Sequence, residues 1–306
     1  YPRWGTSVYG PGDATYNAGI GSMRAQTGAG WVEIVVELYQ DTNGSTTVHY
    51  GPATAPAGDI QAGIDAAHAA GLHVFVVPHL DVNSPAGQWS GTVWVDPSQA
   101  QAWFDSYYQA LAPYLAAAQA ARAEQFAIGT EMNGMEGESS ALWTELSARA
   151  HAAFSGHLTY DINWDRMGAP RSWMRDPNLT YLGVSEYQSV ANQPVALSEA
   201  KIEAFWRQQL LPQFDKFSAA TGKPVILSEV GYHYTSDALW NPWRHTSSAP
   251  ADPRLQADAY TAATRAVYGD PHVVGIYFWA WQNGPFATSA QAASALLALY
   301  PKPPMR

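Results

Sequence analysis

Two glutamates close apolar segments that have the composition of buried strands. Residues 126–131 read FAIGTE and end in Glu131, and residues 224–229 read PVILSE and end in Glu229. Two carboxyl groups that flank one bond can cleave a glycosidic linkage, because one protonates the leaving oxygen while the other attacks the sugar or activates water. Either glutamate alone could equally be a rim residue or a salt-bridge partner. The two together predict a catalytic pair.

The elements that would position this pair are eight short runs rich in Val, Ile and aromatic residues, separated by Ala-rich segments with helical spacing. Such alternation is typical of repeated βα units around a parallel sheet. The expected strands are residues 4–9, 31–39, 73–80, 126–131, 158–163, 181–187, 224–229 and 273–281. The expected helices are residues 17–27, 59–70, 98–123, 140–154, 198–220, 255–268 and 290–299, with only a short or irregular helix within 165–178. We therefore predict an α/β fold, a single (β/α)8 TIM barrel in which residues 1–306 form one catalytic domain.

The loops that follow the expected strands are longer than the connections that lead into them, as in residues 40–56, 81–97 and 230–253. Active sites of such barrels form at the carboxyl ends of the strands, where these loops begin. The fourth and seventh strands face one another across the barrel mouth. We therefore expect Glu131 and Glu229 on opposite sides of a bound substrate.

The composition excludes several classes of protein. Of the 306 residues, 47% are hydrophobic and 14% charged, so the chain can bury a large core. The formal net charge of −10 and the absence of a Lys/Arg run argue against a nucleic-acid partner. With no cysteine and no apolar stretch of about 18 residues, thiolate metal sites and membrane spans are not expected. We expect a secreted monomer whose export signal is not in this sequence, with a cytoplasmic location left open.

Aromatic residues are unusually frequent, with 13 Trp and 17 Tyr, and we expect part of this surface to bind a ligand. Tyr187 ends the sixth expected strand, where its phenol could donate to Glu229 or simply pack at the rim. Trp279 and Trp281 lie two apart on the last strand, so both rings should face the barrel mouth and stack on sugar rings, unless one packs in the core. Four loop tryptophans could form outer subsites or pack within their loops: Trp89, Trp94, Trp240 and Trp243.

Polar residues follow two other strands. Asn163 and Trp164 end the fifth strand, where the amide could bind a sugar hydroxyl. His79 and Asp81 end the third strand and could be metal ligands, but two ligands without a nearby third make a weak zinc site. We favour hydroxyl recognition by His79 and Asp81, and we expect neither a metal nor another cofactor.

Several of these segments resemble glycoside hydrolase family 113, the clan A barrels known as β-mannanases. The strongest matches are Ile128-Gly-Thr-Glu131, Leu158-Thr-Tyr-Asp-Ile-Asn163-Trp164, Tyr181-Leu-Gly-Val184 and Ser228-Glu-Val-Gly-Tyr232. Two more are Leu38-Tyr39-Gln40-Asp41 and Val77-Pro78-His79-Leu80-Asp81. The matches follow the expected strand order over nearly the whole chain. We include Tyr39 among the expected substrate-binding residues.

The resemblance implies a retaining endo-β-1,4-mannanase acting on mannan-type polysaccharides, with Glu131 as acid/base and Glu229 as nucleophile. Glu186 stands where we expect an Asp in the family pattern, and it could bind sugar hydroxyls or hold Arg166 or Arg171. Two alternatives stay open: a hydrolase of another β-linked glycan, and a carbohydrate-binding barrel without catalysis, against which the intact glutamates argue. We also expect the charge of Glu229 to keep Glu131 protonated.

Overall fold

The computed structural model describes residues 3–8, 14–84, 88–282 and 284–299. Within them, one sheet of nine strands runs in the order β1-β9-β8-β7-β6-β5-β4-β2-β3, and pairing of β1 with β2 closes it into a barrel. Eight strands are parallel: β1 (Arg3–Val8), β2 (Trp31–Thr42), β4 (His73–Ser84), β5 (Gln125–Thr130), β6 (His157–Asn163), β7 (Leu182–Glu186), β8 (Val225–Gly231) and β9 (Val273–Trp279). The predicted (β/α)8 fold is confirmed.

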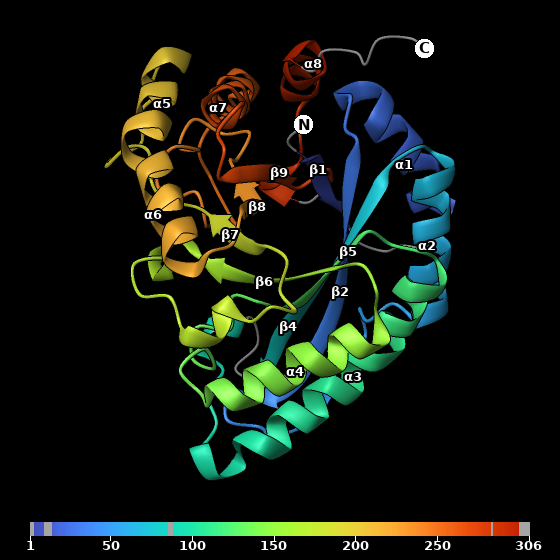
Figure 1. Cartoon of the computed structure of the whole chain (residues 1–306). Helices are drawn as coiled ribbons and strands as arrows, with labels where there is room; N and C mark the ends of the chain where they lie inside the picture. Colours follow the sequence, from blue (N-terminus) through green and yellow to red (C-terminus); the bar gives the residue numbers. More distant parts are fainter. Residues whose placement is uncertain (1–2, 9–13, 85–87, 283, 300–306) are drawn as a thin grey trace.

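Helices surround the sheet, and α3 and α4 run side by side along one flank (Figure 1). They are α1 (Ala14–Thr27), α2 (Ala57–Ala69), α3 (Ala100–Ala120), α4 (Ser140–Ala153), α5 (Glu199–Phe205), α6 (Leu211–Thr221), α7 (Pro253–Val267) and α8 (Ala290–Leu299). A π-helical turn, Trp206–Leu210, joins α5 to α6, and residues 165–178 hold only short 3-10 turns, as predicted. Among the described helices, none has the length and apolar character needed to cross a membrane.

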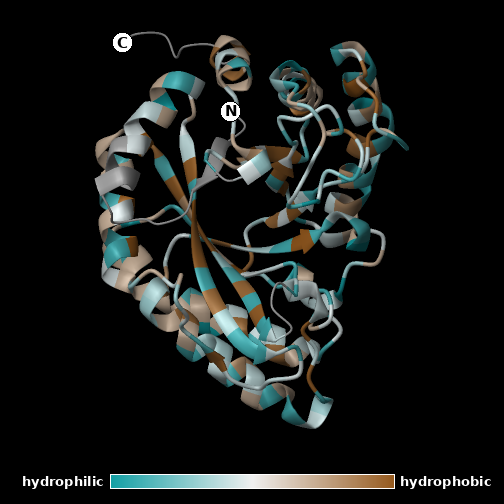
Figure 2. Cartoon of the chain, turned by 180° about the vertical axis from the view of Figure 1, so that it is seen from behind, coloured by the Kyte–Doolittle hydropathy of each residue, from teal (hydrophilic) through white to brown (hydrophobic). Residues whose placement is uncertain are grey.

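The largest difference from the expected elements lies in β2 and β4. Both strands continue beyond their expected ends, and they pair in parallel from Trp31 and His73 to Thr42 and Ser84. The loop expected at residues 40–56 contains a further short strand, β3 (Val48–His49), antiparallel to β2. The last two residues of β2 and of β4 are exposed, so apolar patterning gave no sign of these extensions. Figure 2 shows the same change, from hydrophobic in the barrel to hydrophilic at the strand ends.

Alternation along the strands separates two apolar layers. On β4, Val74 and Val76 face outward and join the large core between sheet and helices. Phe75 and Val77 face inward and join a smaller core inside the barrel. The next residue in the inward series is His79. Along β4, the inward-facing side chains are therefore apolar below and polar toward the carboxyl end of the strand.

One glycine makes room for a buried carboxyl group close to this boundary. Gly183 on β7 pairs with Asp161 on β6, and a Cβ on Gly183 would lie 1.7 Å from Oδ1 of Asp161 and 2.7 Å from Oγ of Ser228. Asp161 is fully buried. A side chain at position 183 would therefore displace the carboxyl group or the strand.

We predict that Gly183→Ala lowers the free energy of unfolding by about 2–3 kcal/mol, the range typical of overpacking in a dense core. The matched control is Gly58→Ala in α2, where a new Cβ meets no atom within 4 Å. This control should leave stability unchanged or raise it by up to about 1 kcal/mol. Urea unfolding followed by circular dichroism measures both. Equal stabilities of the two variants would contradict the packing argument.

Candidate active site

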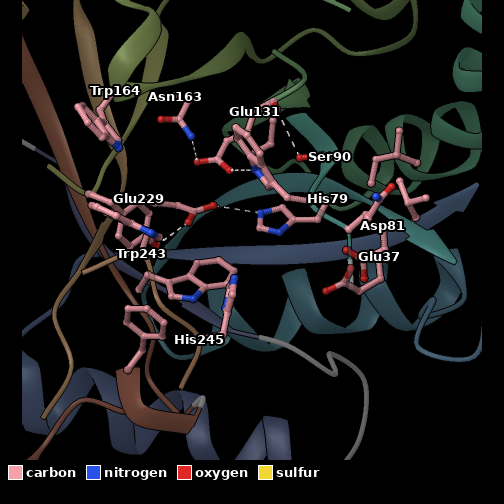
Figure 3. A pocket seen from close by; sticks show the side chains of 18 of the residues that line it. Glu37, His79, Asp81, Ser90, Glu131, Asn163, Trp164, Glu229, Trp243 and His245 are labelled. Atoms are coloured by element: carbon pink, nitrogen blue, oxygen red, sulfur yellow. Dashed lines mark hydrogen bonds and ion pairs between the residues drawn. The ribbon is translucent and has the colours of Figure 1, made fainter. Parts of the chain in front are cut away.

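A cleft of about 870 Å³ opens at the carboxyl ends of the parallel strands. Nine of the eleven predicted site residues line it: Tyr39, His79, Asp81, Glu131, Asn163, Trp164, Tyr187, Glu229 and Trp279. The remaining two, Glu186 and Trp281, do not. Figure 3 shows Glu131 and Glu229 in the middle of the cleft, with Glu37 and Asp81 on one side of them and Trp164 and Trp243 on the other.

Both glutamates reach the cleft through irregularities in their strands. The pairing of β8 with β9 shifts register between Leu227 and Val230, and this places the Glu229 side chain in the cleft beside the inward-facing Ser228. Glu131 follows the last residue of β5 and has a φ of 52°, in the left-handed region that a residue with a Cβ seldom adopts. Bulges and strained residues of this kind re-aim side chains next to functional sites.

Two groups hold the carboxylate of Glu229. The Tyr187 hydroxyl donates a hydrogen bond to Oε2 at 2.7 Å, as the sequence predicts. His79 Nε2 lies 3.2 Å from Oε1, and its ring stacks on Trp279 with centroids 5.2 Å apart and 7° between planes. A hydrogen bond to a carboxylate and a neighbouring cation are both contacts that favour a negative charge.

His79 is charged at neutral pH. Burial alone would lower the pKa of its imidazole, but the contact with Glu229 and the negative charges of Glu229 and Glu37 outweigh burial and raise the pKa to about 10. His79 is thus a partly buried cation beside the Glu229 carboxyl group. Sequence reasoning placed His79 at the site but assigned it to hydroxyl recognition.

Glu131 has different partners and a different charge state. Its Oε1 accepts a hydrogen bond from Nδ2 of Asn163 at 3.3 Å, and its Oε2 accepts one from Nε1 of Trp89. Burial is the largest cause that raises the pKa of Glu131, and the charge of Glu229 adds to it, so the pKa reaches about 7. Our expectation that Glu229 alone accounts for the proton is therefore corrected, because desolvation contributes more.

One side of the cleft is acidic. Glu37 lies beside Asp81, and burial, with smaller contributions from Asp81 and Glu229, raises the pKa of Glu37 to about 7. Sequence reasoning missed Glu37. The signal was available, because Glu37 stands two residues before Tyr39 on β2 and side chains two apart share a face. The register also pairs Glu37 with His79 and Tyr39 with Asp81.

The other side of the cleft is aromatic. Trp164 and Trp243 stack with ring centroids 6.5 Å apart and 28° between planes. Trp89 and Trp243 line the cleft and are 42% and 46% exposed, respectively, whereas Trp94 and Trp240 lie outside it. His245 and Phe286 also line the cleft, and the sequence offered no pattern that pointed to them. Exposed indoles in a polar cleft are suited to stack on the CH faces of sugar rings.

The structure places Trp281 in the outer core, not in the cleft. The alternation that should have put it beside Trp279 ends because β9 stops at Trp279. Many of the other tryptophans are core residues too: Trp103, Trp143 and Trp206 are fully buried, so the aromatic excess serves packing as well as the ligand surface.

Glu186 points outward through the barrel wall, since its neighbours Ser185 and Tyr187 take the inward positions. Its Oε1 accepts a hydrogen bond from the Gln188 amide at 2.8 Å, and burial raises the pKa of Glu186 to about 8. The residue that forms an ion pair with Arg166 is Glu136, at 3.6 Å. The contacts of Glu186 therefore fit neither of the roles considered for it.

No group of three or more His, Asp or Glu side chains in the described part of the chain is arranged to hold a metal ion. Among the carboxyl groups that line the cleft, Glu229 contacts a hydroxyl donor and the His79 cation, whereas the pKa of Glu131 is raised to about 7, and indole rings lie beside them. These groups are suited to acid-assisted nucleophilic displacement at a sugar carbon.

The sequence profile of Glycoside Hydrolase Family 113 matches residues 12–302. The chain belongs to glycoside hydrolase family 113. The resemblance seen in the sequence is thereby confirmed, and the protein is a glycoside hydrolase. No curated protein matches the chain significantly.

Solved structures share the fold of this family 113 chain. One described as a complex of a GH113 β-1,4-mannanase has a TM-score of 0.80 at 19% identity, over 98% of each chain. The GH113 β-mannanase of Alicyclobacillus acidocaldarius, in complex with ManMIm, has a TM-score of 0.79 at 24% identity, over 98% of this chain and 97% of its own. A family 5 mannosidase from Rhizomucor miehei has a TM-score of 0.63 at 11% identity, over 97% and 93%.

The two causes that raise the pKa of Glu131 can be separated by removing the charge of Glu229. We predict that Glu229→Gln lowers the Glu131 pKa from about 7 by about one unit, and that burial keeps it above the ordinary value of 4.5. NMR titration of the side-chain carboxyl carbon measures the shift. Glu186→Gln, which changes a buried carboxyl group outside the cleft, is the control and should leave the Glu131 pKa unchanged. A fall to the ordinary value would mean that burial contributes little.

Proposed function

We propose that this family 113 enzyme is an endo-β-1,4-mannanase that cleaves mannan-type polysaccharides with retention of anomeric configuration. The observation that carries the proposal is the unequal treatment of two carboxyl groups in one cleft. Glu229 accepts a hydrogen bond from Tyr187 and lies beside the His79 cation, while Glu131 has a pKa of about 7 and keeps its proton below that pH. One carboxyl group is thus suited to attack the sugar and the other to donate a proton.

In the first step, a carboxylate oxygen of Glu229 attacks the anomeric carbon of the sugar. The glycosidic carbon–oxygen bond breaks, and the proton of Glu131 passes to the departing oxygen, so the leaving sugar is released as a neutral alcohol. The products are a glycosyl ester on Glu229 and an ionised Glu131. The Tyr187 hydroxyl remains beside the ester, and its hydrogen bond to Oε2 weakens as the negative charge of the carboxylate is lost.

In the second step, the ionised Glu131 removes a proton from water as the water oxygen attacks the anomeric carbon. The ester bond to Glu229 breaks, which returns the electron pair to the Glu229 carboxylate, and Glu131 regains its proton. Two displacements at one carbon retain its configuration. Glu131 thus serves first as acid and then as base, a role that requires a pKa near the working pH.

The substrate class is proposed from the named relatives and from the form of the cleft. Structures that share the fold over almost the whole chain are described as β-1,4-mannanases. Exposed Trp89 and Trp243, and hydroxyl-binding groups such as Asp81, extend the lining away from the catalytic pair. We propose that this lining binds several sugar units of a polymer, that the enzyme acts as a monomer, and that it works outside the cell, where such polymers are found.

A polysaccharide panel tests the proposed function. Release of reducing ends is measured on β-1,4-mannan, glucomannan, cellulose, xylan and β-1,4-galactan, and the configuration of the first product is followed by proton NMR. We expect the highest kcat/KM on mannan and a β-configured first product. Preference for another polymer would reassign the substrate, an α-configured product would exclude retention, and no cleavage of any polymer would contradict catalysis.

The roles of the two glutamates give different kinetic signatures. Glu229→Ala should abolish covalent trapping by a 2-fluoro-mannoside, because no carboxylate remains to form the ester. Glu131→Ala should lose about 10²–10⁴-fold in kcat on mannan, yet still release dinitrophenol rapidly from an activated mannoside, whose departure needs no proton. Mass spectrometry and stopped-flow absorbance measure these outcomes. Glu138→Gln is the control, since Glu138 is a nearby carboxyl group outside the cleft lining. Equal losses on both substrates in the Glu131 variant would contradict its role as the acid.

A further inference from the structure

Protein groups donate to both oxygens of the Glu131 carboxyl group. Asn163 Nδ2 donates to Oε1, and Trp89 Nε1 donates to Oε2. A carboxyl group that receives two donors is stabilised as the anion. As a general acid, however, Glu131 must present a proton to the departing oxygen, and that oxygen must come within hydrogen-bonding distance of the oxygen that carries the proton. One of the two protein donors therefore stands where the substrate has to be.

The two donors differ in how firmly they are held. Asn163 is the last residue of β6, and its backbone pairs with Ser185 of β7. Trp89 comes from the loop between β4 and α3, its side chain lies against the backbone of Gly91, and it is 42% exposed although it bonds a catalytic group. Trp89 also lines the cleft itself. Of the two donors, Trp89 is the one that a ligand can replace.

We propose that Trp89 is a positioning residue that a bound sugar displaces from Glu131, so that binding of substrate itself brings Glu131 into its acid form. Before substrate arrives, the indole N–H holds Glu131 in place and stabilises its anion. When the sugar on the leaving-group side occupies the cleft, the hydrogen bond from the Trp89 indole to Oε2 of Glu131 breaks. The glycosidic oxygen then lies next to Oε2 in place of the indole nitrogen. This inference rests on the proposed glycosidase function of the same site.

The surroundings of Glu131 make its proton sensitive to this one donor. Burial and the Glu229 charge oppose ionisation of Glu131, whereas Trp89, His79 and Ser185 favour it. The pKa of the neighbouring Asp161 is raised well above its ordinary value by burial and by the charges of Glu229 and Glu131. Among the causes that lower the pKa of Glu131, the Trp89 hydrogen bond is the largest. Asn163 completes the set of polar neighbours. When the hydrogen bond from Trp89 is lost, less remains to counteract the effects of burial and of the Glu229 charge. The pKa of Glu131 therefore rises.

The pH dependence of the kinetics distinguishes displacement of Trp89 from a second explanation, in which bound substrate raises the pKa of Glu131 only by excluding water. The alkaline limb of the kcat/KM profile reports the pKa of the general acid in the free enzyme. The alkaline limb of the kcat profile reports the pKa of the same group in the enzyme–substrate complex. Trp89→Phe removes the N–H and keeps a ring. It should move the kcat/KM limb to higher pH by about one unit, the size expected for a hydrogen bond to a charged group, and leave the kcat limb where it is. Trp94→Phe, an exposed indole outside the cleft, should move neither limb.

A second readout does not need turnover. In ¹⁵N-labelled protein, the Trp89 indole resonance is assigned by its loss in Trp89→Phe, and in the free enzyme it should titrate with the pKa of Glu131. Saturation with β-1,4-mannobiose should abolish that titration. The inference is overturned if the indole resonance still titrates in the complex, if both kinetic limbs move together, or if neither moves. Absence of hydrolysis on every polysaccharide, with an intact indole titration in the free protein, would instead contradict the proposed function alone.

Discussion

The site depends on one constraint: two carboxyl groups share a partly buried cleft, where a second negative charge is costly. The structure meets it by placing the His79 cation in direct contact with one of them only. Glu229 has the Tyr187 hydroxyl and the His79 cation, whereas Glu131 has two neutral donors and a largely desolvated position. The proton is therefore favoured on Glu131, and the division of labour that we propose between acid and nucleophile follows from it.

This division requires backbone that departs from regular strands. Inside the barrel, alternate residues of each strand face the axis, and a perfectly regular β8 would send Ser228 and Glu229 to opposite faces. The register shift between Leu227 and Val230 brings both inward, and the positive φ of Glu131 turns its side chain into the mouth after β5 has ended. The regular strands supply rigidity, and the two irregular positions direct the carboxyl groups.

The sequence predicted what depends on local pattern and failed where backbone irregularity decides. Apolar runs and helical spacing were enough for the barrel, and the two strand-end glutamates were enough to place two carboxyl groups in one cleft. Trp281 was misplaced because nothing in its surroundings marks Trp279 as the end of β9. Glu186 was misplaced for a different reason. Adjacent residues of a regular strand face opposite sides, so assigning Tyr187 to the cleft already argued against Glu186. The Trp89 bond to Glu131 joins residues 42 positions apart, and no local pattern reports such a contact.

The polarity of the cleft differs on the two sides of the catalytic pair, and this follows from the pairing of β2 with β4. These two paired strands bring Glu37, Tyr39 and Asp81 in register to one side of the cleft, which makes that wall acidic. The opposite wall comes from short turns and loops, which present the indoles of Trp164 and Trp243. A rigid wall of carboxyl groups is suited to fix hydroxyl positions, whereas stacked rings tolerate sliding of a sugar. The asymmetry thus favours firm binding of one part of a polymer and looser binding of the other.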